Sequence, residues 1–142
     1  MKTYLPTEKD FNAKTYLVNA EGKTLGRIAT KIASILIGKH KTVFCQDKLS
    51  GDSVVVINAE KVQVTGKKRD TKMYKHYTGY PAGLKTYNFE YLMETKPEEI
   101  LKRAVGRMLP KNALGKKMER RLYIYAGAEH KQQAQKPEAL EV

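Results

Sequence analysis

Residues 54–57 read Val-Val-Val-Ile, an unbroken run of apolar, β-branched side chains. A strand with one covered face alternates apolar and polar residues, whereas a strand buried on both faces reads as a continuous apolar run. The turn signal Ser50-Gly51-Asp52 comes directly before the run. The pattern therefore predicts a buried strand in a parallel sheet.

The residues before this run supply the other parts of a β-α-β unit. Residues 16–19 are a candidate strand, and residues 24–37 are a candidate helix that Thr24 caps and Gly38 ends. Apolar side chains recur along one face of this helix, at Leu25, Ile28, Ala29, Ile32, Ile35 and Leu36. Strand, helix and strand over residues 16–57 predict an α/β fold.

Further elements are predicted in residues 97–127, PEEILKRAVGRMLPKNALGKKMERRLYIYAG. A helix begins at Pro97, because proline suits a first helical position, and it ends before Pro110, which cannot continue a helix. A short basic helix follows over residues 116–121, and a strand over residues 122–126. An apolar framework thus carries a dense group of positive charges.

The length of 142 residues predicts one domain, residues 1–142, with a real hydrophobic core. Residues 1–14 are expected to form an irregular N-terminal arm, and residues 128–142 a polar C-terminal tail. The pattern of residues 42–48 is ambiguous. Residues 62–65 either extend the sheet or begin a loop.

The composition predicts a soluble protein of a reducing compartment. The single cysteine, Cys45, excludes an intramolecular disulfide and a cysteine-rich zinc motif. The N-terminus lacks the apolar core of a signal peptide. Nothing in the sequence approaches the ~20 apolar residues of a membrane span.

The positive charge is concentrated in two segments. The net charge of the chain is +12, and residues 66–85 carry +5 of it while residues 101–123 carry the other +7. A chain with such clusters attracts polyanions. A merely solvated basic surface is the alternative for each cluster.

Residues 66–85, GKKRDTKMYKHYTGYPAGLK, predict a long exposed loop or ribbon. Tyr74, Tyr77 and Tyr80 alternate with basic residues that can neutralise phosphates, and tyrosine can stack on unpaired bases. For Tyr74 and Tyr77, packing against their own domain is an equally good interpretation. The sequence contains no helix-turn-helix or aromatic sheet motif, which favours binding to folded RNA over reading of DNA sequence.

Signals for catalysis are weak. Gly22-Lys23-Thr24 resembles the end of a phosphate-binding P-loop, but the first glycine of that motif is replaced by Leu17. A helix N-terminus can hold one phosphate, although a simple turn is the better interpretation. No metal-ligand spacing or nucleophile motif connects the remaining candidates, which are His40, His76, His130, Cys45, Asp47 and Asp52. Asp47 and Asp52 are expected to be solvated, and no cofactor, metal or small-molecule substrate is predicted.

From about Tyr16 to the C-terminus, the chain resembles bacterial large-subunit ribosomal proteins of the L-thirteen family. The matching pieces are GKTLGR at 22–27, GKHK at 38–41, GD at 51–52, VVVINAEKVQVTGKK at 54–68, YKHYTGYPAGLK at 74–85, MLPKNALG at 108–115 and YAGAEH at 125–130. The resemblance implies a three-layer α/β/α fold with a parallel sheet of about four strands. It also implies a non-enzymatic constituent of the cytoplasmic ribosome that binds large-subunit (23S) rRNA early in assembly and lies beside other ribosomal proteins.

The residues expected to bind rRNA come from three parts of the chain. They are Lys39, His40, Lys41, Lys67, Lys68, Arg69, Lys72, Tyr74, Lys75, His76, Tyr77, Lys85, Arg107, Lys111, Lys116, Lys117, Arg120 and Arg121. The chain departs from the family pattern at residues 44–50, at Ala82, at Gly106-Arg107 and at residues 131–132. Two other functions stay open, a small phosphate-handling enzyme built on residues 22–24 and a free RNA-binding regulator outside the ribosome.

Overall fold

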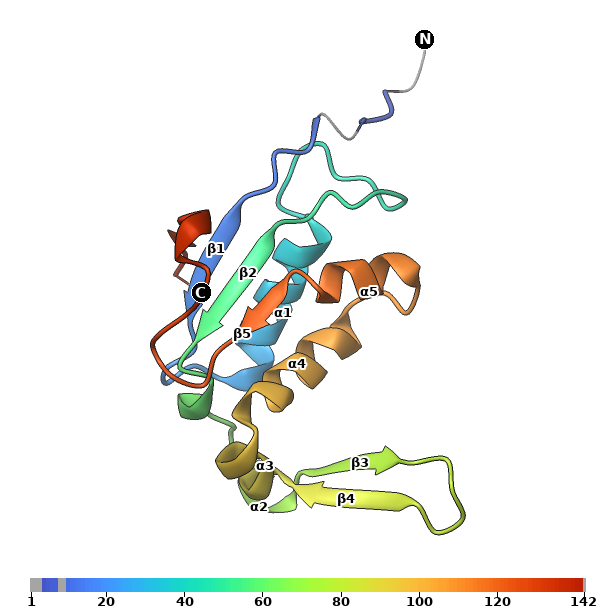
Figure 1. The fold of residues 1–142 in the computed structure, drawn as a ribbon, viewed down its shortest axis with the longest axis vertical. Coiled ribbons are helices and arrows are strands. Elements are labelled where there is room, and N and C mark those ends of the chain that lie inside the picture. The colour runs from blue at the N-terminus through green and yellow to red at the C-terminus, as the bar shows by residue number, and fades with distance from the viewer. Residues whose placement is uncertain (1–3, 8–9, 142) are drawn as a thin grey trace.

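The computed structural model describes residues 4–7 and 10–141, and a four-stranded sheet forms its centre. The strands are β1 (Thr15–Asn19), β2 (Ser53–Ile57), β5 (Leu122–Ile124) and β6 (Glu138–Ala139). Their order is β5-β2-β1-β6, and every neighbouring pair is parallel (Figure 1). The prediction of a parallel sheet of about four strands is confirmed.

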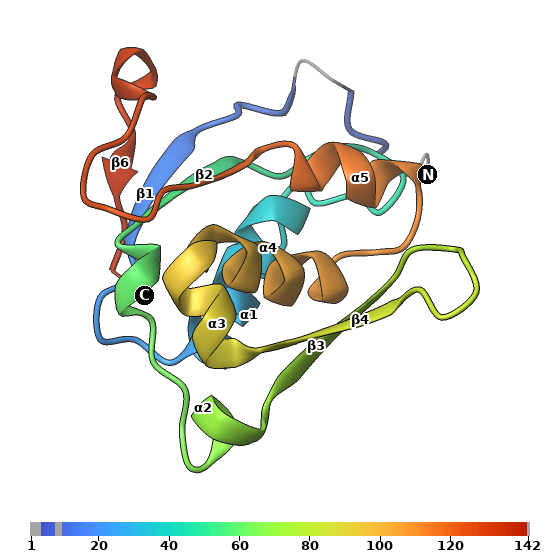
Figure 2. The ribbon, with the colours of Figure 1, turned by 60° about the horizontal axis from the view of Figure 1, so that its bottom comes forward.

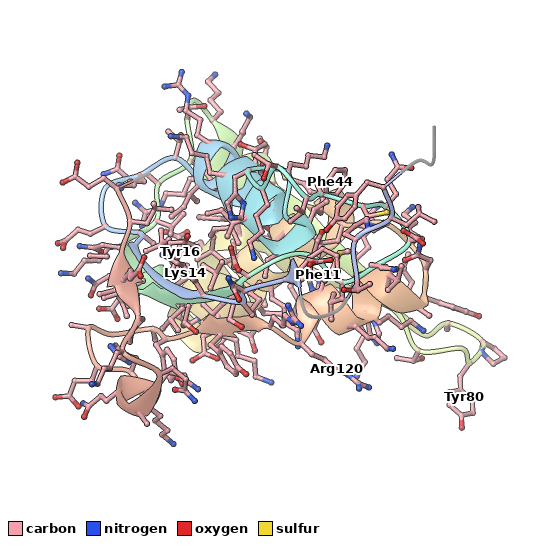
Figure 3. All side chains as sticks on the ribbon, turned by 90° about the horizontal axis from the view of Figure 1, so that it is seen from above. Phe11, Lys14, Tyr16, Phe44, Tyr80 and Arg120 are labelled. Carbon is pink, nitrogen blue, oxygen red and sulfur yellow. The ribbon has the colours of Figure 1, made fainter. Side chains whose placement is uncertain are left out.

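Helices lie on both sides of this sheet, so the α/β/α class is confirmed, but the two outer layers are unequal. One layer contains α1 (Leu25–Ile37), α3 (Phe89–Thr95), α4 (Pro97–Met108) and α5 (Ala113–Glu119). Figure 2 shows α1 and α4 packed together beneath the sheet. The opposite side carries the short 3₁₀ turn η3 (Gln133–Gln135), as Figure 3 shows.

The core forms between β1, β2 and the helical layer. The apolar stripe of α1 is buried as expected, and Ile28, Ile32 and Leu36 are at most 1% exposed. They pack in one cluster with apolar side chains of the sheet and of α4, namely Val18, Val54, Val56, Ile100, Leu101 and Val105. Burial of this area is the main source of stability.

The ends of α1 agree with the predicted helix except for the cap. Gly38 ends the helix with a left-handed backbone, φ 88°, and its N–H donates to the carbonyl oxygens of Ser34 and Ile35. Thr24 precedes the first helical residue, but its side chain caps none of the described N–H groups of the helix. The Leu25 N–H donates instead to the Gln63 carbonyl at 2.9 Å.

Other elements differ in extent from the prediction. Helix α5 begins at Ala113 rather than at residue 116, because the Asn112 side chain caps it and accepts from the Gly115 N–H at 2.8 Å. Strand β5 ends at Ile124, two residues earlier than predicted. The polar tail contributes β6, which pairs with β1. Beyond η2 (Ala59–Lys61), residues 62–65 form only an isolated bridge.

The basic segment 66–85 is a ribbon, as one of its two interpretations predicted. After the single helical turn α2 (Lys68–Thr71), β3 (Met73–Tyr77) pairs antiparallel with β4 (Leu84–Asn88). This hairpin projects from the lower end of the body in Figure 1, at the end opposite to the N-terminal arm. Only Tyr74 of strand β3 is buried, which explains why the segment lacks the periodicity of a core element.

Replacing Gly106 by alanine is expected to stabilise the fold by about 0.5–1 kcal/mol, because glycine inside a helix costs that much relative to alanine. A Cβ at this position of α4 would come no closer than 3.4 Å, to a carboxylate oxygen of Glu119. That contact is ordinary and involves the end of a flexible side chain. The check is the denaturant midpoint. Gly115→Ala is the control and should lower the midpoint, since its Cβ would lie 1.8 Å from the Pro110 carbonyl oxygen.

Candidate nucleic-acid interface

Basic side chains from both charged segments meet around α4. One side of the helix borders a groove against β5, here called the α4–β5 groove, and the other side borders a pocket against the start of α1, here called the α1–α4 pocket. Arg103 and Arg107 line both. They are one helical turn apart, so their side chains share one face of α4 and form the ridge between the two hollows.

The α4–β5 groove has a volume of about 1390 Å³, and its lining combines six cations with three carboxylates, Glu98, Glu99 and Glu119. Its cations are Lys96, Lys102, Arg103, Arg107, Lys116 and Arg120. Glu99 neutralises Arg103 at 2.7 Å, and Tyr123 exposes 39% of its surface beside the cations. Cations interleaved with an exposed aromatic ring suit RNA, whose phosphates they neutralise and whose bases stack on the ring.

The α1–α4 pocket has a volume of about 700 Å³ and contains Lys68, Lys72 and Tyr74 from the hairpin segment. Burial, with smaller contributions from Lys68 and Arg107, lowers the pKa of Lys72. Burial raises the pKa of Tyr74, and Arg107 and Arg103 partly offset this rise. The hydroxyl of Tyr74 therefore keeps its proton at neutral pH.

The structure shows which of the hairpin tyrosines are buried and which are exposed, a question that the sequence left open for Tyr74 and Tyr77. Tyr74 is 4% exposed, with Lys72 Nζ 5.5 Å and Arg103 Cζ 5.7 Å from its ring centre, so packing is its role in this conformation. Tyr77 is 61% exposed and open to a base. Tyr80, at the hairpin tip, and Arg120 both point away from the body in Figure 3.

The remaining hairpin residues are exposed along the ribbon. His76 pairs across the strands with Lys85, and Lys75 pairs with Thr86. Residues Lys67 and Arg69 lie just before and within α2. Arg69 forms an exposed ion pair with Glu90 at 3.3 Å, which a competing phosphate can replace.

Lys39, His40 and Lys41 follow the C-terminal end of α1 and line neither hollow. Lys39 and His40 are exposed. His40 Nε2 also contacts Asp52 at 2.8 Å, and the half-buried Lys41 contacts it through Nζ at 2.5 Å. The expectation that Asp52 is solvated is wrong, because its side chain is 0% exposed. His40 and Lys41 thus act on the fold, and their contact with rRNA stays a prediction.

The four cations expected to share one side of a basic helix do not behave alike. Lys116, Lys117 and Arg120 are exposed, as is Lys111 in the loop before α5. Arg121 is half-buried beyond the helix, and its guanidinium donates to the Gly51 carbonyl. The prediction that all four form one free ridge is therefore wrong for Arg121.

The candidate catalytic residues are not brought together. Gly22 and Lys23 form a turn in which their N–H groups donate to the Lys61 and Ala20 carbonyls. His40 contacts Asp52, whereas Cys45 donates to Asp47. Among residues 4–7 and 10–141, His, Cys, Asp and Glu form no group that suits a metal ion, and no helix is long and apolar enough to cross a membrane.

Four basic side chains of the two hollows are absent from the predicted set. Arg27 lies in the first turn of α1, Lys96 lies directly before α4, and Lys102 and Arg103 lie on α4. The one-turn spacing of Arg103 and Arg107 was a usable signal in the sequence. Arg27 offered none, because only the folding of α1 against α4 brings it to the pocket.

Comparison with known proteins identifies the family. The family model described as Ribosomal protein L13 matches residues 13–131. The chain is 54% identical over 142 residues to the large ribosomal subunit protein uL13 of Caldanaerobacter subterraneus subsp. tengcongensis, covering 100% of this chain and 99% of the relative. It is 51% identical over 142 residues to the protein of the same name from Thermus thermophilus, covering 100% of both chains. The match to the uL13 protein of Clostridioides difficile is 52% over 140 residues, or 99% of this chain and 98% of that protein. The chain therefore belongs to the ribosomal protein L13 family.

Proposed function

We propose that this protein is a structural constituent of the large ribosomal subunit that binds large-subunit (23S) rRNA and acts early in subunit assembly. The relatives that match it over their whole length are named large ribosomal subunit proteins. The structural observation that supports RNA binding is the convergence of both basic segments on the two sides of α4. The RNA site proposed here is the α4–β5 groove together with the hairpin.

The geometry suits the joining of RNA segments. The hairpin projects from the body that carries the groove (Figure 1), so the two basic surfaces can each contact a different RNA backbone. Tyr77 and Tyr80 on the hairpin add rings that can stack on unpaired bases. Neighbouring ribosomal proteins are the other expected partners.

A free RNA-binding regulator and a phosphate-handling enzyme are the competing functions. No contact among the described residues favours either, and the turn at residues 22–24 uses the N–H groups of Gly22 and Lys23 internally. Fractionation of cell extract on a sucrose gradient separates the first competitor from the proposal. A large-subunit protein sediments with the large subunit, whereas a regulator stays near the top.

The exposed cations of α5 test the RNA site. Changing Lys116, Lys117 and Arg120 to Gln is expected to weaken binding to a large-subunit rRNA fragment, because up to three phosphate contacts are lost. Each lost contact reduces the slope of log affinity against log salt by ~0.7–0.9, so the total reduction is up to about 2–3. Arg121 is left unchanged because it donates to Gly51.

The measurement is a salt titration of binding, with a thermal melt beside it. The matched control removes the same charge at Lys31, Lys131 and Lys136, which are exposed and line neither hollow. The control should keep the parent slope. An unchanged slope in the folded α5 variant would move the RNA site away from this face, to the hairpin.

A further inference from the structure

We propose that a pocket between α3 and residues 60–64, here called the α3 pocket, docks an arginine side chain from a basic segment of a neighbouring protein. Glu60, Glu90 and Glu94 line this pocket, and they line neither of the hollows beside α4. The proposal rests on the proposed function for the setting of the partner, which is the large subunit. The binding chemistry follows from the pocket itself.

Negative charge gathers at α3, between the two basic segments of the chain. Residues 86–99 contain four glutamates and one lysine, a net charge of −3, and they separate residues 66–85 from residues 101–123. Glu90 and Glu94 are one helical turn apart, so they share one face of α3. A surface of this sign repels phosphates and attracts cations. The α3 pocket therefore suits a basic protein segment rather than RNA.

Two carboxylates of the α3 pocket are free to accept a cation. Glu60 of η2 and Glu94 of α3 are both exposed, and neither forms an ion pair within residues 4–7 and 10–141. Lys61, which follows Glu60 and also lines the pocket, pairs instead with Glu21 at 2.8 Å. An incoming cation thus meets two carboxylates without displacing an ion pair of either.

The chain's own Arg69 shows that a guanidinium binds on this face. Arg69 belongs to α2, which packs against α3 (Figure 1), and its guanidinium pairs with Glu90 at 3.3 Å. A second guanidinium, from a partner, would meet Glu60 and Glu94 in the same manner. Arginine is favoured over lysine because its planar fork of donors can bond two carboxylate oxygens at once.

The remaining walls of the α3 pocket are apolar and match the stem of an arginine. Val62 and Phe89 are buried, whereas Val64 and Met93 are half-buried and keep surface available for contact. The pocket has a volume of about 390 Å³, which leaves room for a long side chain. Arginine packs its methylene groups along such apolar surface while its charged head stays among polar groups.

The test adds a blocked peptide, Gly-Arg-Gly-Arg-Gly, to the full chain and follows the NMR shifts of the Val64 and Met93 amides. Saturable shifts are expected in the parent. In the double variant Glu60→Gln with Glu94→Gln, the affinity should fall about tenfold, because two exposed ion pairs are lost. Absence of saturable shifts in the parent, or equal affinities of the two proteins, would overturn the proposal.

The matched control is the double variant Glu129→Gln with Glu141→Gln. Both residues are exposed and line none of the three pockets, so the control has the same change of net charge. It should bind the peptide as the parent does. An equal loss in the control would show attraction to net charge alone and contradict the docking. Thermal melts establish that both variants are folded.

Two further probes test the chemistry of the occupant. The corresponding lysine peptide should bind more weakly than the arginine peptide, and tighter binding would contradict the choice of arginine. A short single-stranded RNA should leave the Val64 and Met93 amides unchanged. Shifts of these amides with RNA, and none with the arginine peptide, would assign the pocket to RNA.

A last arm looks for the partner in the assembled large subunit. A carbodiimide with a small amine labels exposed carboxylates, so Glu60 and Glu94 should react in the free protein and lose this labelling in the subunit. Labelling in the subunit as strong as in the free protein would overturn the docking. Sedimentation with the large subunit is measured separately, so the pocket can fail while the proposed function stands. If the chain does not sediment there, the peptide titration still decides whether the pocket binds arginine.

Discussion

The Gly51→Ala variant is expected to lose about 3 kcal/mol or more of folding free energy. A Cβ on Gly51 would lie 1.7 Å from the Leu36 carbonyl oxygen and 2.4 Å from its carbon. Both are backbone atoms of α1 and cannot rotate away as a side chain would. The last turn of α1 and the segment leading into β2 would have to separate, which disturbs the core around Leu36.

Equilibrium denaturation measures this loss, and Gly127→Ala is the control. The backbone of Gly127 does not require glycine, and its Cβ would have no described atom within 4 Å. Its free energy of unfolding should therefore stay within about 0.5 kcal/mol of the parent. A Gly51→Ala midpoint equal to that of the control would mean that α1 and β2 are not packed this closely.

Removal of the Asp52 carboxylate is expected to lower the free energy of unfolding by about 3–5 kcal/mol. This is the usual loss when one partner of a buried ion pair is removed and the other stays. The fully buried side chain accepts from the Lys14 N–H at 2.9 Å, from His40 Nε2 and from Lys41 Nζ. In Asp52→Ala, the Lys41 side chain, which is 15% exposed, would keep the Asn12 carbonyl as its one acceptor among the described residues. One carboxylate thus ties the segment before β1 to the end of α1.

The measurement is again the free energy of unfolding, for Asp52→Ala, Asp52→Asn and Asp47→Ala. The asparagine keeps one acceptor oxygen and should lose less than the alanine. Asp47 is exposed and accepts from its neighbour Cys45, so its loss should be within about 0.5 kcal/mol. Equal stabilities of the two alanine variants would contradict the structural role of Asp52.

The helices and strands whose residue pattern repeats over a few positions could be predicted from the sequence. The stripe of α1, the apolar run of β2 and the proline at the start of α4 each contain their own signal. Signals of this kind depend on residues a few positions apart, so tertiary structure is not needed to read them. The class of sheet followed from β2 alone, because a run without polar alternation implies cover on both faces.

Features that depend on distant segments were not predictable. Asp52 looks like an exposed loop acid until residues 14, 40 and 41 converge on it. Two-residue β6 has no pattern of its own, and its pairing with β1 defines it. Likewise, Tyr74 and Tyr77 become distinct only when the hairpin gives them opposite faces. The basic clusters were visible as charge, but Arg27 and the α1–α4 pocket exist only after folding.

The position of β6 has a consequence for the order in which the protein forms during synthesis. Strands β1, β2 and β5 and their helices are complete once residue 124 has been made. The outer edge of β1 still lacks its partner, because that partner is residues 138–139. Open strand edges pair readily with other chains, so the growing chain passes through an interval of elevated aggregation risk. The two-residue β6 then covers the edge of β1 at Tyr16 and Leu17 and leaves a shorter strand at that side of the sheet.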